Sequence, residues 1–246
     1  MKQASQRQHE GRSNYEQGSG LFRLNTALLS NNLRTAQPGE DAIQHQIDRA
    51  LAANCLILVQ ASGESWEGSG FHLGGGFVAT ASHVCPPELR NKPSQIILTF
   101  DGRTPFPATV LASTAEYDSA ILYSPHIARS IPAVQLGDSD ECKRGDTVAV
   151  IGCPEGFLDT ATVGRITNIH QGLGAGAPTP AWKDCLMIDA EIHQGASGGM
   201  VINEEGLVVG SVMGISGQNA DKGVGEEFVC PSNKIKKLID MIREGR

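Results

Sequence analysis

A glycine-rich stretch, HQGASGGM at residues 193–200, places a serine where a tight turn is expected. Gly195, Gly198 and Gly199 surround Ser197, and glycine permits the sharp backbone that would expose such a side chain. On its own this pattern is typical of an ordinary turn. It indicates chemistry only if a base and an orienting acid lie elsewhere in the chain.

Two other segments contain a histidine and an aspartate that could serve these roles. His83 follows the apolar stretch GSGFHLGGGFVATAS, and Asp118 opens the apolar stretch SAILYS. Taken singly, His83 is more typical of a hydrogen-bonded structural histidine and Asp118 of an acid at the end of a strand. Together the three residues, in the order His83, Asp118 and Ser197, are of the types that form a catalytic triad, and their agreement favours that interpretation over three separate structural roles.

Acyl transfer is the chemistry that such a triad performs. A serine hydroxyl is a weak nucleophile at neutral pH and needs a base to take its proton. His83 would take the proton and later return it to the leaving amine, while Asp118 would hold the histidine tautomer. The backbone N–H groups of Gly195 and Ser197 would form the oxyanion hole.

Short apolar runs, rich in Val, Ile, Thr and Phe and separated by turns, would have to position these residues. Such spacing is typical of an all-β barrel or sandwich, and twelve runs suffice for two six-stranded barrels. Alternation of strands and helices, which would indicate a parallel α/β fold, does not occur in the middle of the chain. The runs are CLILVQAS, GSGFHL, GFVATAS, QIILTF, ATVLAS, SAILYS, TVAVIG, ATVGRIT, CLMIDAEI, GGMVIN, LVVGSVMG and EFVCP.

The N-terminal part of the sequence precedes the strand runs. Residues 1–40 are rich in polar residues and predict a tail that the turn pair Pro38-Gly39 closes. An amphipathic helix is predicted over residues 41–53. Its apolar face would consist of Ile43, Ile47 and Leu51.

At the other end, residues 233–244 predict a terminal helix, with Ser232 as its N-cap. We therefore expect a first barrel with His83 and Asp118 over residues 41–130. A second barrel with Ser197 and the terminal helix would occupy residues 131–246.

Composition excludes several classes of protein. The chain of 246 residues has a net charge of −7, which gives little electrostatic support for binding nucleic acid. No apolar run approaches the roughly 20 residues of a membrane span. The apolar stretch LFRLNTALL is interrupted by polar residues and does not resemble a secretory signal, so a cytoplasmic location is expected.

Six cysteines occur in the sequence, and without a secretory signal they are expected to be free thiols. They form no CxxC pair, so neither a metal nor another cofactor is expected. Cys153 is expected to be a small buried residue rather than a redox-sensitive one. The cysteines are Cys55, Cys85, Cys142, Cys153, Cys185 and Cys230.

With these motifs together, the sequence resembles a chymotrypsin-fold serine protease, nearest to the HtrA/Deg group of trypsin-like peptidases. ATASHV resembles the motif around the catalytic histidine of that group, YDSAIL its aspartate motif and DAEIHQGASGGMVIN its serine motif. The resemblance covers about residues 43–243 and implies two antiparallel Greek-key barrels. It implies a serine endopeptidase acting on extended or unfolded polypeptide, without the PDZ domain common in the group. It also suggests a homotrimer assembled through residues 21–53.

The resemblance leaves the preference at P1, the residue before the scissile bond, open. An ungapped count from Ser197 places Glu191 at the floor of the S1 pocket, where an acid would favour Arg or Lys. The alternative is that Glu191 points elsewhere, because an unpaired buried carboxylate is costly. The other expected substrate-binding residues are Ile192, His193, Val212, Met213 and Gly214. The apolar members of this set slightly favour a medium aliphatic P1.

Two alternatives to a general endopeptidase stay open. A chaperone-like or interaction module on the same fold would carry a silent triad, although intact His83, Asp118 and Ser197 argue against decay. A protease that processes one dedicated precursor, or its own polar tail, would carry the same residues.

Overall fold

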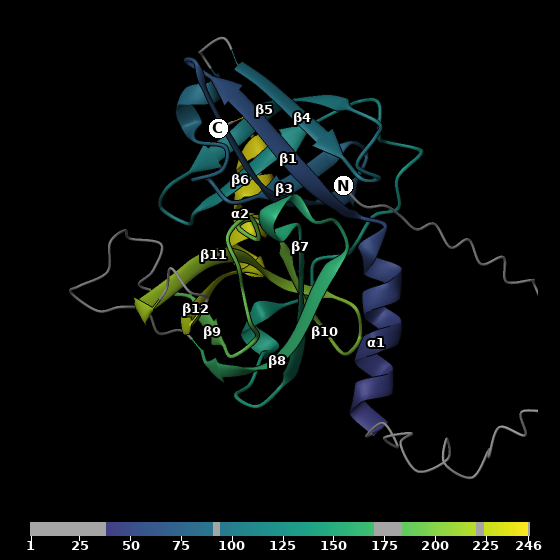
Figure 1. Cartoon of the computed structure of the whole chain (residues 1–246), viewed down its shortest axis with the longest axis vertical. Helices are drawn as coiled ribbons and strands as arrows, with labels where there is room; N and C mark the ends of the chain where they lie inside the picture. Colours follow the sequence, from purple (N-terminus) through teal and green to yellow (C-terminus); the bar gives the residue numbers. More distant parts are fainter. Residues whose placement is uncertain (1–37, 91–93, 170–183, 220–223, 246) are drawn as a thin grey trace, which may run out of the picture. The chain divides into compact units, whose positions relative to one another are not determined.

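A computed structural model of the chain describes residues 38–90, 94–169, 184–219 and 224–245. Twelve strands form two closed six-stranded barrels, one above the other in Figure 1, and a helix lies at each end of the described part. Each of the twelve apolar runs of the sequence corresponds to one strand. The predicted all-β fold with two antiparallel barrels and two helices is therefore confirmed.

The first barrel contains strands β1 to β6, which close in the order β1-β2-β3-β6-β5-β4. A 3₁₀ turn, η1 (Pro87–Arg90), follows β3. The strands are β1 (Asn54–Ala61), β2 (Glu64–Gly74), β3 (Phe77–Thr80), β4 (Ser94–Thr99), β5 (Phe106–Thr114) and β6 (Ser119–Tyr123).

The second barrel contains strands β7 to β12, in the closed order β10-β11-β12-β9-β8-β7. Two 3₁₀ turns lie beside β7: η2 (Ser139–Glu141) before it and η3 (Pro154–Gly156) after it. The strands are β7 (Thr147–Gly152), β8 (Thr160–Asn168), β9 (Leu186–Ile188), β10 (Met200–Asn203), β11 (Val208–Asn219) and β12 (Val224–Pro231).

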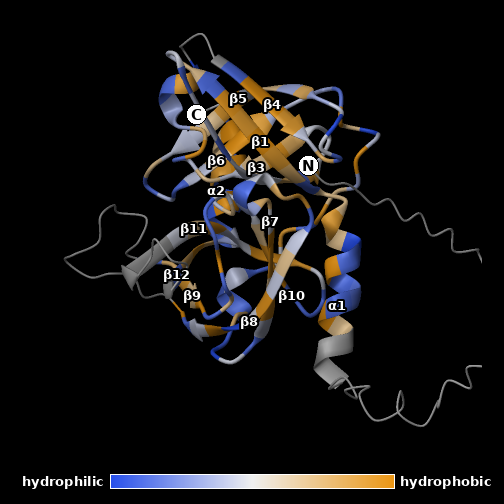
Figure 2. Ribbon diagram, in the orientation of Figure 1, coloured by the Kyte–Doolittle hydropathy of each residue, from blue (hydrophilic) through white to orange (hydrophobic). Residues whose placement is uncertain are grey.

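Buried side chains form a core inside each barrel and a third cluster between the barrels. The third cluster joins Phe71 of β2 and Ile121 of β6 to Ile151 of β7 and Phe228 of β12, so it fixes one barrel on the other. In Figure 2 the apolar residues follow the strands of both barrels, as this arrangement requires. Burial of each such large side chain stabilises the fold by roughly 1.5–3 kcal/mol.

Helix α1 (Pro38–Leu51) packs on the second barrel beside β7 and β10. Ile43 and Ile47 are 2% and 3% exposed, as the predicted apolar face requires. The helix begins three residues earlier than predicted. Proline is suited to the first turn of a helix, because its N–H is not needed there and its φ is preset, so Pro38 starts the helix rather than closing the tail.

Helix α2 (Ser232–Arg243) packs against strands of both barrels, chiefly β6 and β11. The prediction that Ser232 caps this helix is wrong. Pro231 occupies the N-cap position, and the Ser232 hydroxyl donates to the carbonyl of Gly137 at 2.8 Å. A long-range tertiary bond has displaced the local cap. The predicted polar tail and most of the proposed trimer segment, residues 21–37, lie outside the described residues.

Candidate active site

The pairing of β3 with β6 brings His83 and Asp118 together. These strands are antiparallel, with Thr80 opposite Ala120, so the end of β3 and the start of β6 lie at the same edge of the first barrel. His83 lies three residues beyond Thr80, and Asp118 lies two residues before Ala120. Two positions far apart in sequence therefore share one site.

The Asp118 carboxylate accepts hydrogen bonds from three groups around His83. Its two oxygens lie 3.0 and 2.9 Å from His83 Nδ1, and Oδ1 also accepts from the His83 backbone N–H and from Ser82 Oγ, each at 3.0 Å. The Asp118 side chain is 10% exposed, whereas that of His83 is 47% exposed. The ring is thus held at one nitrogen while much of its surface faces outward.

Asp118 lies at φ +49°, in the left-handed region. Asp and Asn tolerate this region better than most residues because their short polar side chains bond locally. The strained backbone position directs the carboxylate at His83, and the bonds from Ser82 and His83 help to hold it there.

Ser197 belongs to the second barrel, in the loop between β9 and β10, yet its backbone contacts the first barrel. Its carbonyl accepts a hydrogen bond from the backbone N–H of Ser69 on β2 at 2.8 Å. The next residue, Gly198, packs so closely that an added Cβ would strike Thr80 Oγ1 and the Ser69 carbonyl. Because Thr80 lies three residues before His83, this packing brings the serine loop to the histidine segment.

Ser69 holds the serine loop through its side chain as well. Its buried hydroxyl donates to the Gly195 carbonyl and accepts from the Cys153 N–H, each at 2.7 Å. One hydroxyl of the first barrel thus fixes two loops of the second. Ser69 could not be singled out from the sequence, because a serine within a strand run carries no local signal of a bond to Gly195, 126 residues away.

The backbone of the serine loop is also fixed at Gln194. Its carbonyl accepts from the Glu155 N–H of η3 at 2.9 Å, and Gly195 follows at φ +91°. A Cβ on Gly195 would lie 2.8 Å from Glu155 N, so glycine is required on steric grounds too. Neighbouring Cys153 is fully buried, as predicted, and burial raises the pKa of its thiol to about 12.

The predicted substrate-binding residues divide into two groups. Glu191 points into solvent, with its side chain 66% exposed, and its carboxylate lies 3.2 Å from His193 Nε2. Ile192, Val212 and Met213 are buried among core side chains. Gly214 lies on β11 opposite Phe228. In this structure Glu191 therefore interacts with His193 rather than being buried alone.

A second acid in this region, Glu227 on β12, was not singled out from the sequence. Its side chain is 4% exposed, and its Oε2 is buried without a hydrogen-bond partner. Burial raises the pKa of this carboxyl to about 7, and the nearby Glu191 charge adds to the rise. The Ile192 N–H, which donates to the Glu227 carboxylate, opposes the rise.

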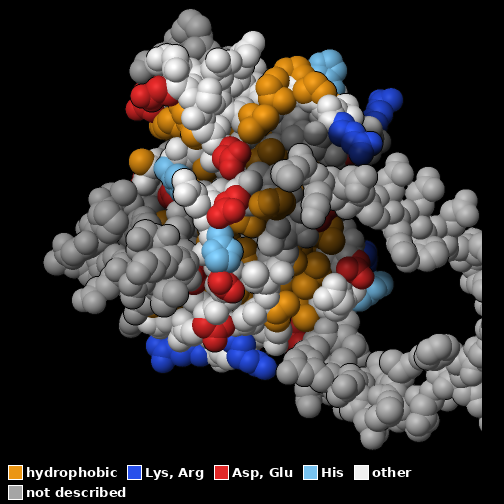
Figure 3. Space-filling model, in the orientation of Figure 1, with side chains coloured by type: hydrophobic (Ala, Val, Ile, Leu, Met, Phe, Trp, Pro, Cys, Tyr) orange, Lys and Arg blue, Asp and Glu red, His pale blue; other side chains and the backbone are white. Residues whose placement is uncertain are grey.

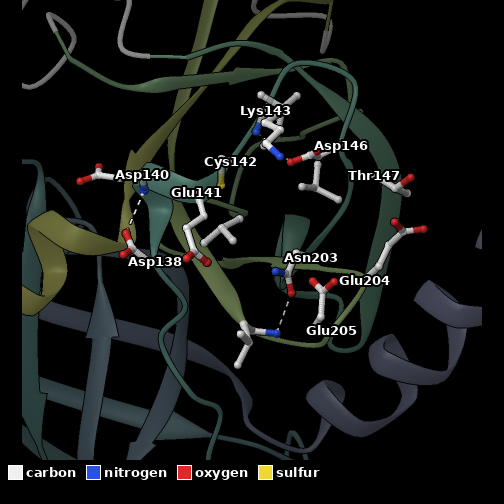
Figure 4. A pocket seen from close by; sticks show the side chains of 14 residues that line it. Asp138, Asp140, Glu141, Cys142, Lys143, Asp146, Thr147, Asn203, Glu204 and Glu205 are labelled. Atoms are coloured by element: carbon white, nitrogen blue, oxygen red, sulfur yellow. Dashed lines mark hydrogen bonds between the residues drawn. The ribbon is translucent and has the colours of Figure 1, made fainter.

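A large pocket of about 680 Å³ lies away from these residues, on the second barrel (Figure 4). Several acidic side chains line it, but some have structural partners. Asp138 accepts from Asp140 N, and Asp146 accepts from Lys143 N, so both close local turns. None of the triad candidates lines this pocket.

The described residues contain no group of three or more His, Cys, Asp or Glu side chains arranged to hold a metal ion. Within the same residues, no helix is both long and apolar enough to cross a membrane. All six cysteines lie in the described part of the chain, where they are buried and form no disulfide.

Two closed barrels of matching strand order, with a bonded His–Asp pair on one and a glycine-bounded serine on the other, define the chymotrypsin-like class of folds. Residues 68–210 match the family model described as a trypsin-like peptidase domain, and the chain belongs to this family.

Curated relatives point to the HtrA/DegP-like branch of the family. The chain is 33% identical over 178 residues to serine protease Rv3671c of Mycobacterium tuberculosis, a match that covers 71% of this chain and 41% of the relative. It is 31% identical over 193 residues to a probable periplasmic serine endoprotease, DegP-like, of Chlamydia pneumoniae, covering 75% of this chain and 36% of the relative. The chain thus matches about two-fifths of the length of these relatives.

Solved structures support the same branch. The HtrA-type protease AlgW with a tripeptide superposes with a TM-score of 0.72 at 26% identity, covering 83% of this chain and 64% of that one. An inactive form of Rv3671c superposes with a TM-score of 0.63 at 26% identity, covering 81% and 90%. The resemblance drawn from the three motifs is therefore confirmed.

The predicted cytoplasmic location is wrong by these comparisons. The DegP-like relatives from Chlamydia pneumoniae, Brucella suis and Buchnera aphidicola are all named probable periplasmic serine endoproteases. The prediction depended on reading residues 1–40 for a signal, and a missing signal in a given sequence is weak evidence of compartment.

Proposed function

We propose that the protein is a serine endopeptidase that cleaves polypeptides through Ser197, His83 and Asp118. The observation that carries this proposal is the bond between His83 Nδ1 and the Asp118 carboxylate at 2.9 Å, at the edge of the first barrel against which the Ser197 loop packs. A structural histidine would more often bury both ring nitrogens, as His72 does between Pro132 O and Gly76 N. The His83 side chain is instead 47% exposed, and among the described residues its hydrogen bonds are made by Nδ1, so Nε2 is available for a proton transfer.

In the proposed reaction, Ser197 Oγ attacks the scissile carbonyl while His83 Nε2 takes its proton. The Asp118 carboxylate keeps the ring proton on Nδ1 and stabilises the imidazolium that forms. His83 then protonates the leaving amine, which leaves an acyl-enzyme on Ser197. Water, activated by the same histidine, releases the acid product and restores the serine.

The loop geometry supports an oxyanion hole formed by the N–H groups of Gly195 and Ser197. In a trans peptide the carbonyl and the following N–H point in opposite directions. Because the Gln194 carbonyl is bound by Glu155 N, the Gly195 N–H faces the other way. Among the described residues neither Gly195 N–H nor Ser197 N–H donates to a backbone carbonyl, so both are available to an oxyanion.

Strand β11 offers an edge on which an extended peptide could bind. Up to Val212 its backbone bonds to β10 or to the serine loop, where Gly198 N donates to Val212 O at 2.9 Å. Beyond Val212, β12 is the one strand that pairs with β11 in the described residues. A substrate added at this free edge would run past Ser197, which fits extended or unfolded polypeptide as substrate. The periplasmic relatives favour a substrate outside the cytoplasm.

Labelling with a fluorophosphonate probe tests the proposal. We expect the wild-type protein to take one label, and Ser197→Ala to take none while keeping its thermal unfolding transition. Folded wild-type protein that takes no label would refute the endopeptidase function. It would favour a chaperone-like or interaction module instead.

A further inference from the structure

Glu227 is a buried carboxylate with unmet bonding capacity. Its side chain is 4% exposed, one oxygen has no partner, and the Ile192 N–H is its one hydrogen bond recorded among the described residues. Burying a carboxylate without a cation costs several kcal/mol unless the group is protonated. Carboxylates buried at such a cost are concentrated at functional sites.

The position of Glu227 relates it to Ser197 along two paths. Through its hydrogen bond, it contacts Ile192, five residues before Ser197 on the segment that leads to the nucleophile. Through strand pairing, it lies opposite Ile215 of β11, three residues beyond Val212, which bonds to the serine loop. The carboxylate thus lies where the serine segment and the substrate strand are both within reach.

The spacing along the paired strands β11 and β12 gives the depth of this position. Val212 pairs with Val229 and Ile215 pairs with Glu227, because a bulge lies between Val212 and Gly214, so the two positions are two residues apart along β12. Two residues of a strand cover about 7 Å. A substrate carbonyl at Ser197 would place its P1 side chain between the 192–197 segment and β11. A long side chain that extends along this direction would approach Glu227, whereas a short one would stop well before it.

Charge in the region is negative as well. Glu191 is near enough to raise the pKa of Glu227, and its one ion-pair partner among the described residues is His193. In Figure 3 several acidic side chains, with a histidine among them, lie along the face that crosses both barrels. A cationic side chain that enters beside Ser197 would therefore be attracted by the exposed Glu191 carboxylate. It would then pair with the buried Glu227 carboxylate.

We propose that Glu227, assisted by Glu191, selects lysine or arginine at P1. A guanidinium or ammonium group would supply the free Glu227 oxygen with a charge-assisted hydrogen bond. An aliphatic P1 would leave this buried oxygen without a partner and would gain no such bond. The inference rests on the proposed endopeptidase function, and it assigns the acidic role to a residue on β12 rather than to Glu191 alone.

Peptides that differ only at P1 test the inference. For wild-type protein we expect kcat/KM with Lys or Arg to exceed that with Leu or Val by roughly 10- to 100-fold, the range for a buried charge contact. Glu227→Gln keeps the shape of the side chain and should bring the Lys-to-Leu ratio close to one. Glu191→Gln should lower the ratio less, because its carboxylate is exposed. Glu205→Gln, in the distant acidic pocket, should leave the ratio unchanged.

A preference of the wild type for Leu or Val, or an unchanged ratio in Glu227→Gln, would overturn the inference. Benzamidine, an aromatic cation, provides a measurement without a variant. It should inhibit peptide cleavage competitively, while uncharged benzyl alcohol should not, and equal weak inhibition by both would also overturn the inference. Fluorophosphonate labelling distinguishes a failure of the P1 inference from a failure of the proposed endopeptidase function. Labelled protein with an aliphatic preference refutes the P1 inference alone, whereas unlabelled protein refutes the endopeptidase function and the inference with it.

Discussion

Replacing Gly198 by alanine tests whether the serine loop depends on close packing against the first barrel. Gly198 lies at φ +83°, and an added Cβ would strike Thr80 Oγ1 and the Ser69 carbonyl and lie 2.8 Å from Ala81 N. Two of these three atoms are backbone, which cannot turn away. The loop must therefore shift, and Ser197 must shift with it.

Gly63 provides a matched control for the backbone strain. It lies at φ +84°, but an added Cβ there would meet nothing within 4 Å. Gly63→Ala should therefore cost only the strain of a left-handed alanine, about 1 kcal/mol. Gly198→Ala adds the steric clash, and we expect a total loss of about 3–5 kcal/mol.

Urea denaturation measures the stability of both variants, and the rate of fluorophosphonate labelling measures the position of Ser197. We expect Gly63→Ala to label at the wild-type rate and folded Gly198→Ala to label at least about 100-fold more slowly, because a displacement near 1 Å has such an effect. Equal losses of stability in the two variants, or normal labelling of Gly198→Ala, would refute the packing argument.

Three further predictions concern the site. Asp118→Asn should lower kcat about 10⁴-fold with little loss of fold, because asparagine tolerates the left-handed backbone but does not stabilise the imidazolium; activity within 10-fold of wild type would exclude the triad role. Ser69→Ala leaves the Gly195 carbonyl and the Cys153 N–H without their shared partner, so the free energy of unfolding should fall by about 1–3 kcal/mol. Because Gly195 belongs to the serine loop, kcat should also fall by a larger factor than KM rises. Loss of stability alone would assign Ser69 a purely structural role. The pKa of the Glu227 carboxyl is about 7 in the folded protein against an ordinary 4.5, so the folded state binds the extra proton between these values and wild-type stability falls as pH rises through them. Between pH 4 and pH 8 the unfolding free energy of the wild type should therefore fall by up to about 3 kcal/mol relative to that of Glu227→Gln. Denaturation at both pH values measures this change, and a difference between the two proteins that does not vary with pH would contradict the raised pKa.

Much of the architecture could be predicted because strand runs are a local property of the sequence. Each apolar run became a strand, and the Ile43 and Ile47 spacing located a helix. Motif order singled out His83 and Asp118, which the β3–β6 pairing then places in contact. Local patterns carried these features, so the sequence was enough to anticipate them.

What the sequence could not provide depends on contacts between distant segments. Ser232 has the composition of a helix cap, but its hydroxyl bonds to Gly137 instead. Ser69 and Glu227 lie within strand runs, where a polar residue is normally taken as the solvent-facing half of an alternating pattern. Their burial follows from barrel closure and from which strands become neighbours, and neither is encoded in a short window of residues.

The hydroxyl of Ser69 makes the two halves of the molecule interdependent. The second barrel contains Ser197, but the hydroxyl that donates to the Gly195 carbonyl and fixes the serine loop belongs to the first barrel. A fragment cut between the barrels, even if it folded, would carry Ser197 on a loop without its anchor. Reassembly of two separately produced halves would then restore labelling only when both barrels dock, so recovery of reactivity would report the docking itself.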